Sequence, residues 1–180
     1  MASPAQARII DAALELFSEH GVGGTSLQMI ADAVGVTKAA VYHQFKTKDE
    51  IVLAAAEAEL ARVAAAVEAA ETESDPERAR DLLVSRMVDL AVERRRMESG
   101  LIGDPVIVRF FASHEAFRRV MERLYAILVG DAGPDARVSA AMLTAAIGGA
   151  VMHPLVAQLD DETLRAQLLQ LARRFLNLPD

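Results

Sequence analysis

Residues 25–48 read TSLQMIADAVGVTKAAVYHQFKTK, and this stretch decides the fold of the N-terminal part of the chain. A hydroxyl side chain that can cap a helix stands before each half: Thr25 or Ser26 before the first, and Thr37 before the second. Gly35 lies between the halves, where a tight turn requires a positive φ. The stretch therefore predicts two short helices joined by a turn, which is a helix-turn-helix.

The second of these helices is predicted to expose most of its side chains. The two helices share a small core, and the apolar side chains that serve it are Ile30, Val34, Val36 and Val41. With those residues facing inward, residues 38–40, 42 and 43 face solvent. This row is narrow, and it suits the major groove of duplex DNA.

Residues 5–52 resemble the DNA-binding domain of the TetR family of bacterial transcription regulators, over roughly the first third of the chain. The resemblance depends on the order and spacing of the run IIDAALELF at residues 9–17 and of Gly21, Thr25, Ile30, Ala31, Gly35, Val36, Tyr42, Phe45, Lys48 and Glu50. It implies two sets of contacts. The residues facing base edges are Lys38, Ala39, Ala40 and His43, and those holding phosphates are Thr25, Thr37, Tyr42 and Lys48.

Several of these residues have a second interpretation. Ala39 and Ala40 can touch a thymine methyl group but form no hydrogen bonds, so sequence choice would fall to Lys38, His43 and DNA shape. Tyr42 could instead be a packed aromatic ring with its hydroxyl in water. His43 could cap or pack as a neutral imidazole, and Lys48 could be a solvated lysine.

The charge of the chain is unusual for a DNA-binding protein, because the net charge is −7. The first 50 residues hold four bases and six acids, a net charge of −2. Three lysines nevertheless cluster around the predicted second helix, and helix N-termini can hold phosphates without side-chain charge. We therefore expect low affinity for non-specific DNA.

Helical periodicity continues along the whole chain, with no alternating strand pattern. It predicts helices over residues 4–20, 48–70, 77–97, 115–129, 135–157 and 160–176, with a further short helix within 101–112. The predicted fold is all-α, with about nine helices. The family resemblance implies that it comprises a three-helix helix-turn-helix DNA-binding domain over residues 1–47 and a helical ligand-binding and dimerisation domain over residues 48–180.

The last two predicted helices carry more apolar surface than one domain of this size is expected to bury. Residues 140–152 are apolar apart from Thr144, yet this run is shorter than the ~20 residues needed to cross a bilayer. The final helix has a stripe formed by Leu164, Leu168, Leu171 and Phe175. The family resemblance implies that two subunits pair these helices in a four-helix bundle, so we expect a homodimer and no membrane association.

The resemblance also implies that the second domain binds a small effector molecule. Adaptable apolar pockets use methionine and aromatic side chains, and the candidate residues are Met87, Met97, Arg109, Phe111, Phe117, Met121, Tyr125 and Met142. Each apolar member could equally be ordinary core. Arg109 either binds a ligand carboxylate, pairs with Asp104 or extends to solvent. The run at residues 94–96, three arginines near a helix end, is interpreted as solvated surface.

The sequence contains no recognisable motif of an enzyme. Serine-hydrolase, phosphate-loop, zinc-protease and dinucleotide motifs are missing, and the four histidines have no metal-ligand spacing, so we expect no catalytic residue, cofactor or metal. The chain lacks cysteine and begins without a signal-peptide pattern, which favours the cytoplasm. The prediction is a regulator that represses by binding a pseudo-palindromic operator and leaves it when a largely apolar effector binds. The alternative is a helical adaptor that binds protein through the helix-turn-helix.

Overall fold

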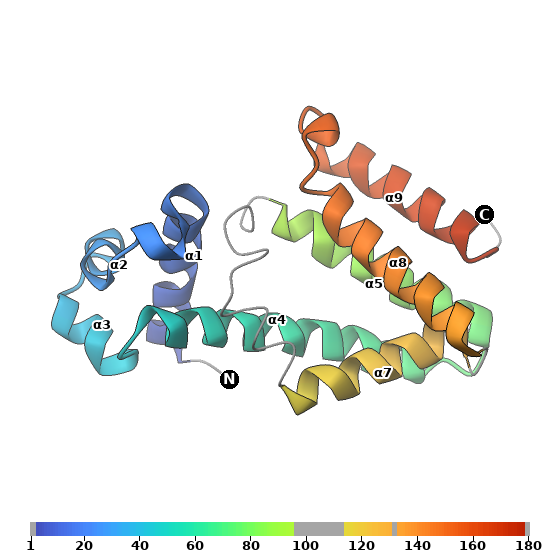
Figure 1. Cartoon of the computed structure of the whole chain (residues 1–180), viewed down its shortest axis with the longest axis horizontal. Helices are drawn as coiled ribbons and strands as arrows, with labels where there is room; N and C mark the ends of the chain where they lie inside the picture. The colour runs from blue at the N-terminus through green and yellow to red at the C-terminus, as the bar shows by residue number, and fades with distance from the viewer. Residues whose placement is uncertain (1–2, 96–113, 131–132, 179–180) are drawn as a thin grey trace. The chain divides into compact units, whose positions relative to one another are not determined.

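The computed structural model describes residues 3–95, 114–130 and 133–178 (Figure 1). These residues form eight α-helices and one short 3-10 helix without any β-strand, which confirms the all-α prediction. The helices are α1 (Pro4–Gly24), α2 (Leu27–Val34), α3 (Lys38–Gln44), α4 (Lys48–Glu71), α5 (Pro76–Arg94), α7 (Glu115–Val129), α8 (Gly133–Ala150), the 3-10 helix η1 (Pro154–Val156) and α9 (Asp161–Phe175).

The described chain divides into two compact units, and α4 contributes to both. The N-terminal unit contains residues up to Ala61, and the C-terminal unit contains Arg62–Arg95 and the residues from Glu115. The first turns of α4 belong with the N-terminal unit because Ile51 and Val52 are buried in its core. The sequence places the domain boundary earlier, after residue 47, where the chain enters α4.

Helix α1 provides the largest part of the N-terminal core. It begins with a capping box, in which Ser3 and Gln6 each accept a hydrogen bond from the backbone N–H of the other. Phe17 is fully buried between the helices. The regular helix breaks at Gly21, whose φ of 70° is strained for any side chain with a Cβ, and one further turn follows. The predicted end of the first helix at Gly21 is confirmed.

The C-terminal unit packs α5, α7, α8 and α9 around an apolar core that includes Leu83, Leu124 and Leu164. Charged side chains then fix how α5 lies against α9. Asp81 binds Arg173 through two hydrogen bonds of 2.6 and 2.9 Å, and Asp89 binds Arg165 at 2.5 Å. The earlier α5 residue, Asp81, pairs with the later α9 residue, Arg173, and the later Asp89 pairs with the earlier Arg165. The two helices are therefore antiparallel.

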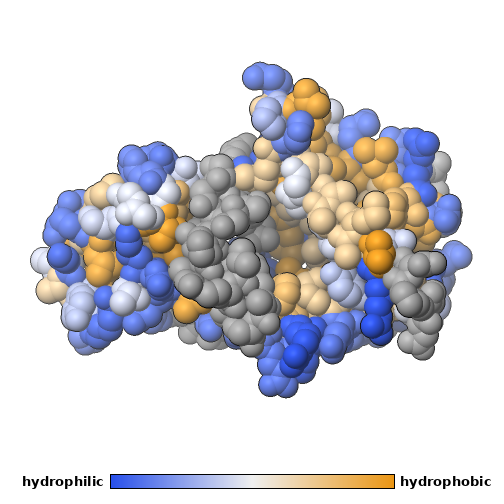
Figure 2. Space-filling model, in the orientation of Figure 1, coloured by the Kyte–Doolittle hydropathy of each residue, from blue (hydrophilic) through white to orange (hydrophobic). Residues whose placement is uncertain are grey.

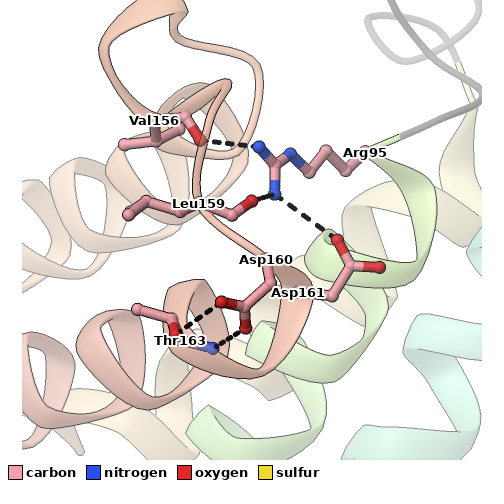
Figure 3. Close-up of polar contacts among 6 residues, drawn as sticks. All are labelled: Arg95, Val156, Leu159, Asp160, Asp161 and Thr163. Carbon is pink, nitrogen blue, oxygen red and sulfur yellow. Dashed lines mark hydrogen bonds and ion pairs between the residues drawn. The ribbon is translucent and has the colours of Figure 1, made fainter.

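Arg95, directly after α5, holds the chain segment between α8 and α9 (Figure 3). Its guanidinium donates hydrogen bonds to the carbonyl oxygens of Val156 at 2.6 Å and Leu159 at 2.7 Å, and it lies 3.4 Å from the carboxylate of Asp161. The Arg95 side chain is only 12% exposed. The interpretation of this arginine as solvated surface is therefore wrong, because three acceptors from the α8–α9 segment surround it.

Helix α8 ends at Ala150, earlier than the predicted end at residue 157. Pro154 cannot continue an α-helix, and the chain instead forms the 3-10 helix η1, which His153 caps by accepting a hydrogen bond from the N–H of Leu155. No helix in the described part of the chain is both long and apolar enough to span a membrane.

Candidate DNA-binding site

The turn between α2 and α3 is built by local hydrogen bonds. Ser26 caps α2 by accepting from the N–H of Met29 at 3.2 Å, and Thr37 caps α3 by accepting from the N–H of Ala40 at 3.2 Å. Gly35 ends α2 with φ 76° and ψ 35°, the left-handed conformation that the sequence predicts. The next residue, Val36, donates its N–H to the carbonyl of Ala31 at 2.9 Å, which closes the turn.

Helix α3 is anchored by its inner face and exposed on its outer face. Val41 is fully buried against the core that includes Ile30 and Phe45. The side chains of the cap and of the outer face are exposed: Thr37, Lys38, Ala39, Ala40, Tyr42 and His43. Six of the eight predicted DNA-binding residues therefore lie together on one accessible surface, here called the α3 face.

The α3 face also includes Lys46, which the sequence reasoning left out of the site. Its ammonium group lies 4.6 Å from the centre of the Tyr42 ring and donates a 2.8 Å hydrogen bond to the Tyr42 carbonyl. Tyr42 is 52% exposed, so the ring supports the lysine without being buried. The signal that could have identified Lys46 was a basic residue two positions after the end of the predicted second helix, close to the exposed Tyr42.

Thr25 lies elsewhere, and a phosphate contact through its hydroxyl is not supported. Only 2% of the residue is exposed. Its hydroxyl oxygen lies 2.9 Å from the carbonyl of Gly21 and 3.2 Å from that of Leu16, so the single hydroxyl proton is shared between two acceptors near the end of α1. Thr25 therefore stabilises the N-terminal unit, and Ser26 takes the capping role.

Lys48 also has a structural partner. Its ammonium group donates to the carbonyls of Val22 at 2.6 Å and Gly23 at 3.3 Å, where the last turn of α1 leaves carbonyls without helical partners. A positive charge is favourable at this end of a helix. The solvated-lysine interpretation is wrong, and a phosphate would have to share the ammonium group with these carbonyls.

Three of the four bases in the first 50 residues donate hydrogen bonds to carbonyls at helix ends, and Lys46 does so to the Tyr42 carbonyl in the last turn of α3. Lys48 serves α1, and Arg8 donates to the carbonyl of Val34, the last residue of α2, at 3.2 Å. Lys38 is the remaining base, and both Lys38 and Lys46 are exposed on the α3 face. The positive charge available to DNA is therefore concentrated on α3 although the unit is acidic overall.

The predicted ligand-binding residues do not form one site in the described structure. Met87, Phe117, Met121 and Tyr125 are half-buried in the C-terminal unit. Met142 is 60% exposed on the outer side of α8, which does not suit a pocket wall. Three residues lie outside the described part of the chain: Met97, Arg109 and Phe111. The two hollows described in this unit, between α4 and α5 and between α5 and the end of α9, contain none of these eight residues.

Three capped helices with a glycine turn and an exposed third helix define a helix-turn-helix domain. Residues 9–55 match the profile of a family described as bacterial regulatory proteins, tetR family. The chain is 54% identical over 43 residues to the HTH-type transcriptional regulator AcrR of Shigella flexneri, which is 24% of this chain and 20% of that protein.

A second relative is the negative transcriptional regulator IcaR of the icaADBC biofilm operon from Staphylococcus epidermidis. It is 46% identical over 44 residues, which is 24% of each protein. These matches cover less than a quarter of the length of the two curated relatives. They therefore concern the N-terminal domain.

Solved structures resemble the whole chain. A TetR-family regulatory protein from Rhodococcus RHA1 has a TM-score of 0.75 at 24% identity, covering 99% of this chain and 100% of the other. The TetR-family regulator PfmR from Thermus thermophilus has a TM-score of 0.72 at 24% identity, covering 93% and 97%. SmeT in complex with triclosan has a TM-score of 0.71 at 23% identity, covering 96% and 91%.

Residues 9–55 match the model of the tetR family of bacterial regulatory proteins, and the chain has the fold of solved structures of tetR-family regulators. This confirms the resemblance inferred from the sequence. The matched proteins are named as transcription regulators.

Proposed function

We propose that the protein is a sequence-specific repressor of transcription that binds a pseudo-palindromic operator as a homodimer and leaves it when a small, largely apolar effector binds. The α3 face carries this proposal. It combines a rigidly capped helix, exposed side chains and the two exposed lysines of the domain. The match of residues 9–55 to the tetR family supports the same function.

The α3 face offers two kinds of contact. Lys38, Ala39, Ala40 and His43 would face base edges, with the alanine methyl groups against thymine methyls and Lys38 donating to guanine or phosphate. Thr37, Tyr42 and Lys46 would hold phosphates, since these three residues are exposed. Lys48 would contact a phosphate only through an ammonium hydrogen that it does not donate to the carbonyls at the end of α1.

A homodimer is supported by the outer surface of the last two helices. On α8 the buried residues Leu143 and Ile147 alternate with an outer row that is also apolar: Val138, Ala141, Met142, Ala145, Ala146 and Gly149. On α9 Leu171 and Phe175 are exposed. Figure 2 shows the visible surface over α8 as largely hydrophobic. A contiguous exposed apolar surface of this kind marks an interface. A second copy of the chain would cover it.

Repression and effector release rest on the comparisons. IcaR is named as a negative regulator, and the structure of SmeT holds triclosan, a small molecule. By analogy, an effector in the C-terminal unit would change the separation of the two α3 faces and so weaken operator binding. Met87, Phe117, Met121 and Tyr125 remain candidate pocket residues for it.

The helical adaptor is the competing function, because the acidic charge suits a protein partner. Binding of the purified protein to the DNA upstream of its own gene, measured across salt concentrations, separates the two. A regulator should show log Kobs falling with log salt at a slope of about −0.9 per phosphate contacted. If log Kobs hardly changes with salt on both this duplex and a random duplex, the protein is no DNA-binding regulator and the adaptor function is favoured.

The role of Tyr42 can be tested within the same assay. Tyr42→Phe should weaken specific and random duplex binding alike, by about fivefold for each hydroxyl contact of roughly 1 kcal/mol. The matched control is Tyr125→Phe, which removes the hydroxyl of the other tyrosine in the chain, on α7. Lys38→Ala or His43→Ala should instead change the preferred sequence. A loss confined to one sequence in Tyr42→Phe would contradict the phosphate assignment.

A further inference from the structure

A groove of about 380 Å³ lies between α4 and α5, within the C-terminal unit. Each helix contributes four residues at positions i, i+3, i+4 and i+7, which is one face of a helix. The α4 residues are Arg62, Ala65, Ala66 and Ala69, and the α5 residues are Arg86, Asp89, Leu90 and Glu93. Small-molecule sites commonly have volumes of ~300–1,000 Å³.

The alanines of α4 create the hollow. A side chain that ends at Cβ fills little space, so three alanines on one face leave room that leucines would occupy. Ala66 is buried at the bottom, while Ala65 is exposed and Ala69 half-buried. Leu90 provides apolar surface from α5. The floor of the groove therefore suits an apolar group.

The charges around this floor leave one cation without a partner in the described structure. Glu93 forms an ion pair with Arg62 across the groove. Asp89 forms an ion pair with Arg165 of α9 at 2.5 Å. Arg86 is exposed and has no hydrogen bond or ion pair among the described residues. Both acids are thus neutralised, and the available charge is the single guanidinium of Arg86.

We propose that this groove binds a small monoanionic amphiphile, with its carboxylate on Arg86 and its apolar part over Ala65, Ala69 and Leu90. A guanidinium can hold a carboxylate through two parallel hydrogen bonds. A doubly charged phosphate ester fits less well, because Asp89 and Glu93 lie in the same groove and one free cation cannot balance it. A cationic ligand would meet two acids that already have partners.

The groove is also connected to α9, the helix on the proposed dimer surface. Asp89 is both a wall of the groove and the partner of Arg165, whose guanidinium also lies 3.5 Å from the hydroxyl of Ser85. A carboxylate on Arg86 would add negative charge beside Asp89 and so change the strength of the ion pair between Asp89 and Arg165. Any effect of the bound carboxylate on DNA binding rests on the proposed function, whereas binding of the carboxylate to the groove does not.

Titration calorimetry on the full chain tests the binding with octanoate, with 2-naphthoate as a flat carboxylate and with octanol as the uncharged match of octanoate. We expect at least one carboxylate to bind, and octanoate to bind about tenfold or more tightly than octanol, as the loss of a charge-assisted contact predicts. Failure of both carboxylates to bind, or equal affinity for octanoate and octanol, would overturn the proposal.

Variants assign the binding to the groove. Arg86→Gln should lower carboxylate affinity about tenfold or more. Arg118→Gln is the matched control, because it makes the same charge change on the exposed side of α7, and it should bind as the wild type does. Ala65→Leu should fill the groove and weaken binding without any change of charge. Undiminished binding in both Arg86→Gln and Ala65→Leu would overturn the assignment.

A separate measurement follows operator DNA with and without octanoate, for wild type and Arg86→Gln. We expect octanoate to change operator affinity in the wild type and much less in Arg86→Gln. If the protein binds no DNA at all, the proposed function fails, while the calorimetric result still decides whether the groove takes a carboxylate.

Discussion

The hydroxyl of Thr25 is buried near the end of α1, where it faces two backbone carbonyls. A carbonyl that loses its donor in a buried position has no water to replace it, and this costs about 1–3 kcal/mol. Thr25→Val keeps the shape of the side chain and removes only the donor. We therefore expect it to lower the free energy of unfolding by about 1–3 kcal/mol, as measured by urea denaturation.

Thr25→Ser is the matched control, because it retains the hydroxyl. It should recover most of the stability lost in Thr25→Val. Operator affinity at a temperature where both variants are folded should stay close to the wild-type value. A loss of DNA affinity in fully folded Thr25→Val would instead support the phosphate contact that the family resemblance implied.

At the residue scale, the sequence identified the residues whose roles depend on nearby backbone groups in the chain. Gly35 needed a positive φ, and Ser26 and Thr37 were recognised as possible caps, because each depends on a chain segment of four residues or fewer. The bonds of Thr25 and Lys48 to backbone carbonyls were not foreseen: Thr25 bonds to Gly21 and Leu16, four and nine residues earlier, and Lys48 bonds to Val22, 26 residues earlier. Lys48 finds the carbonyl of Val22 only after α1 and α4 have packed.

At the element scale, periodicity located most helices closely. The predicted helix at 115–129 matches α7, which an apolar stripe defines, and the one at 48–70 matches α4, which is rich in alanine, the strongest helix former. The end of α8 was misplaced because the predicted helix continued through Pro154, four residues after Ala150. The arginine and aspartate pairs between α5 and α9 could not be predicted, since helix register depends on packing.

Arg95 should stabilise the α8–α9 segment, since it is the donor to the carbonyls of Val156 and Leu159. Arg95→Met keeps an unbranched side chain but leaves these carbonyls without a donor. We expect a loss of about 1–3 kcal/mol in unfolding free energy, and faster hydrogen exchange at residues 155–160. The unfolding free energy of Arg95→Lys should lie between those of the wild type and Arg95→Met, because one ammonium group cannot reach both carbonyls as a guanidinium does. Unchanged exchange in Arg95→Met would show that the segment is held by other contacts.

Asp160, the N-cap of α9, should give the protein an acid-sensitive contact. The backbone N–H of Thr163, 2.8 Å from the carboxylate, and the Thr163 hydroxyl, 2.9 Å away, lower the pKa of Asp160 (Figure 3). A carboxylate whose folded pKa is depressed stabilises the fold above its unfolded pKa of about 3.9. This contribution is lost as the pH falls through the folded pKa. Glu71 acts in the same direction, because its hydrogen bond from Arg123 lowers its pKa.

The Asp160 contribution is measured by thermal unfolding of wild type and Asp160→Asn between pH 7 and pH 3. Asparagine still caps a helix but has no charge to lose. The difference in Tm between the two proteins should therefore be larger at pH 7 than at pH 3. A difference that stays constant over this range would exclude a role for the carboxylate charge.

At the scale of the whole molecule, the family resemblance and the fold could be derived from the first 52 residues and from helical periodicity, whereas the groove proposed as a ligand site could not. The exposed apolar rows on α8 and α9 follow from their sequences, since both faces of α8 are apolar. The groove between α4 and α5 depends on which face of each helix meets the other. Alanines at positions 65, 66 and 69 read as ordinary helix formers until that packing is known.

The last two helices should decide whether the protein binds an operator at all, because two α3 faces must act together. Leu171 and Phe175 are 57% and 45% exposed, so Asp at either position should leave the single chain folded. In a dimer the same substitution would bury two unpaired charges near the two-fold axis. We expect Leu171→Asp and Phe175→Asp to be monomers by sedimentation, with operator affinity reduced at least 100-fold, roughly the effect of losing one of two linked heads. Ala166→Asp is the control, since it places the same charge on α9 roughly 140° around the helix from Leu171, and it should remain dimeric. A stable dimer in both Leu171→Asp and Phe175→Asp would place the interface elsewhere.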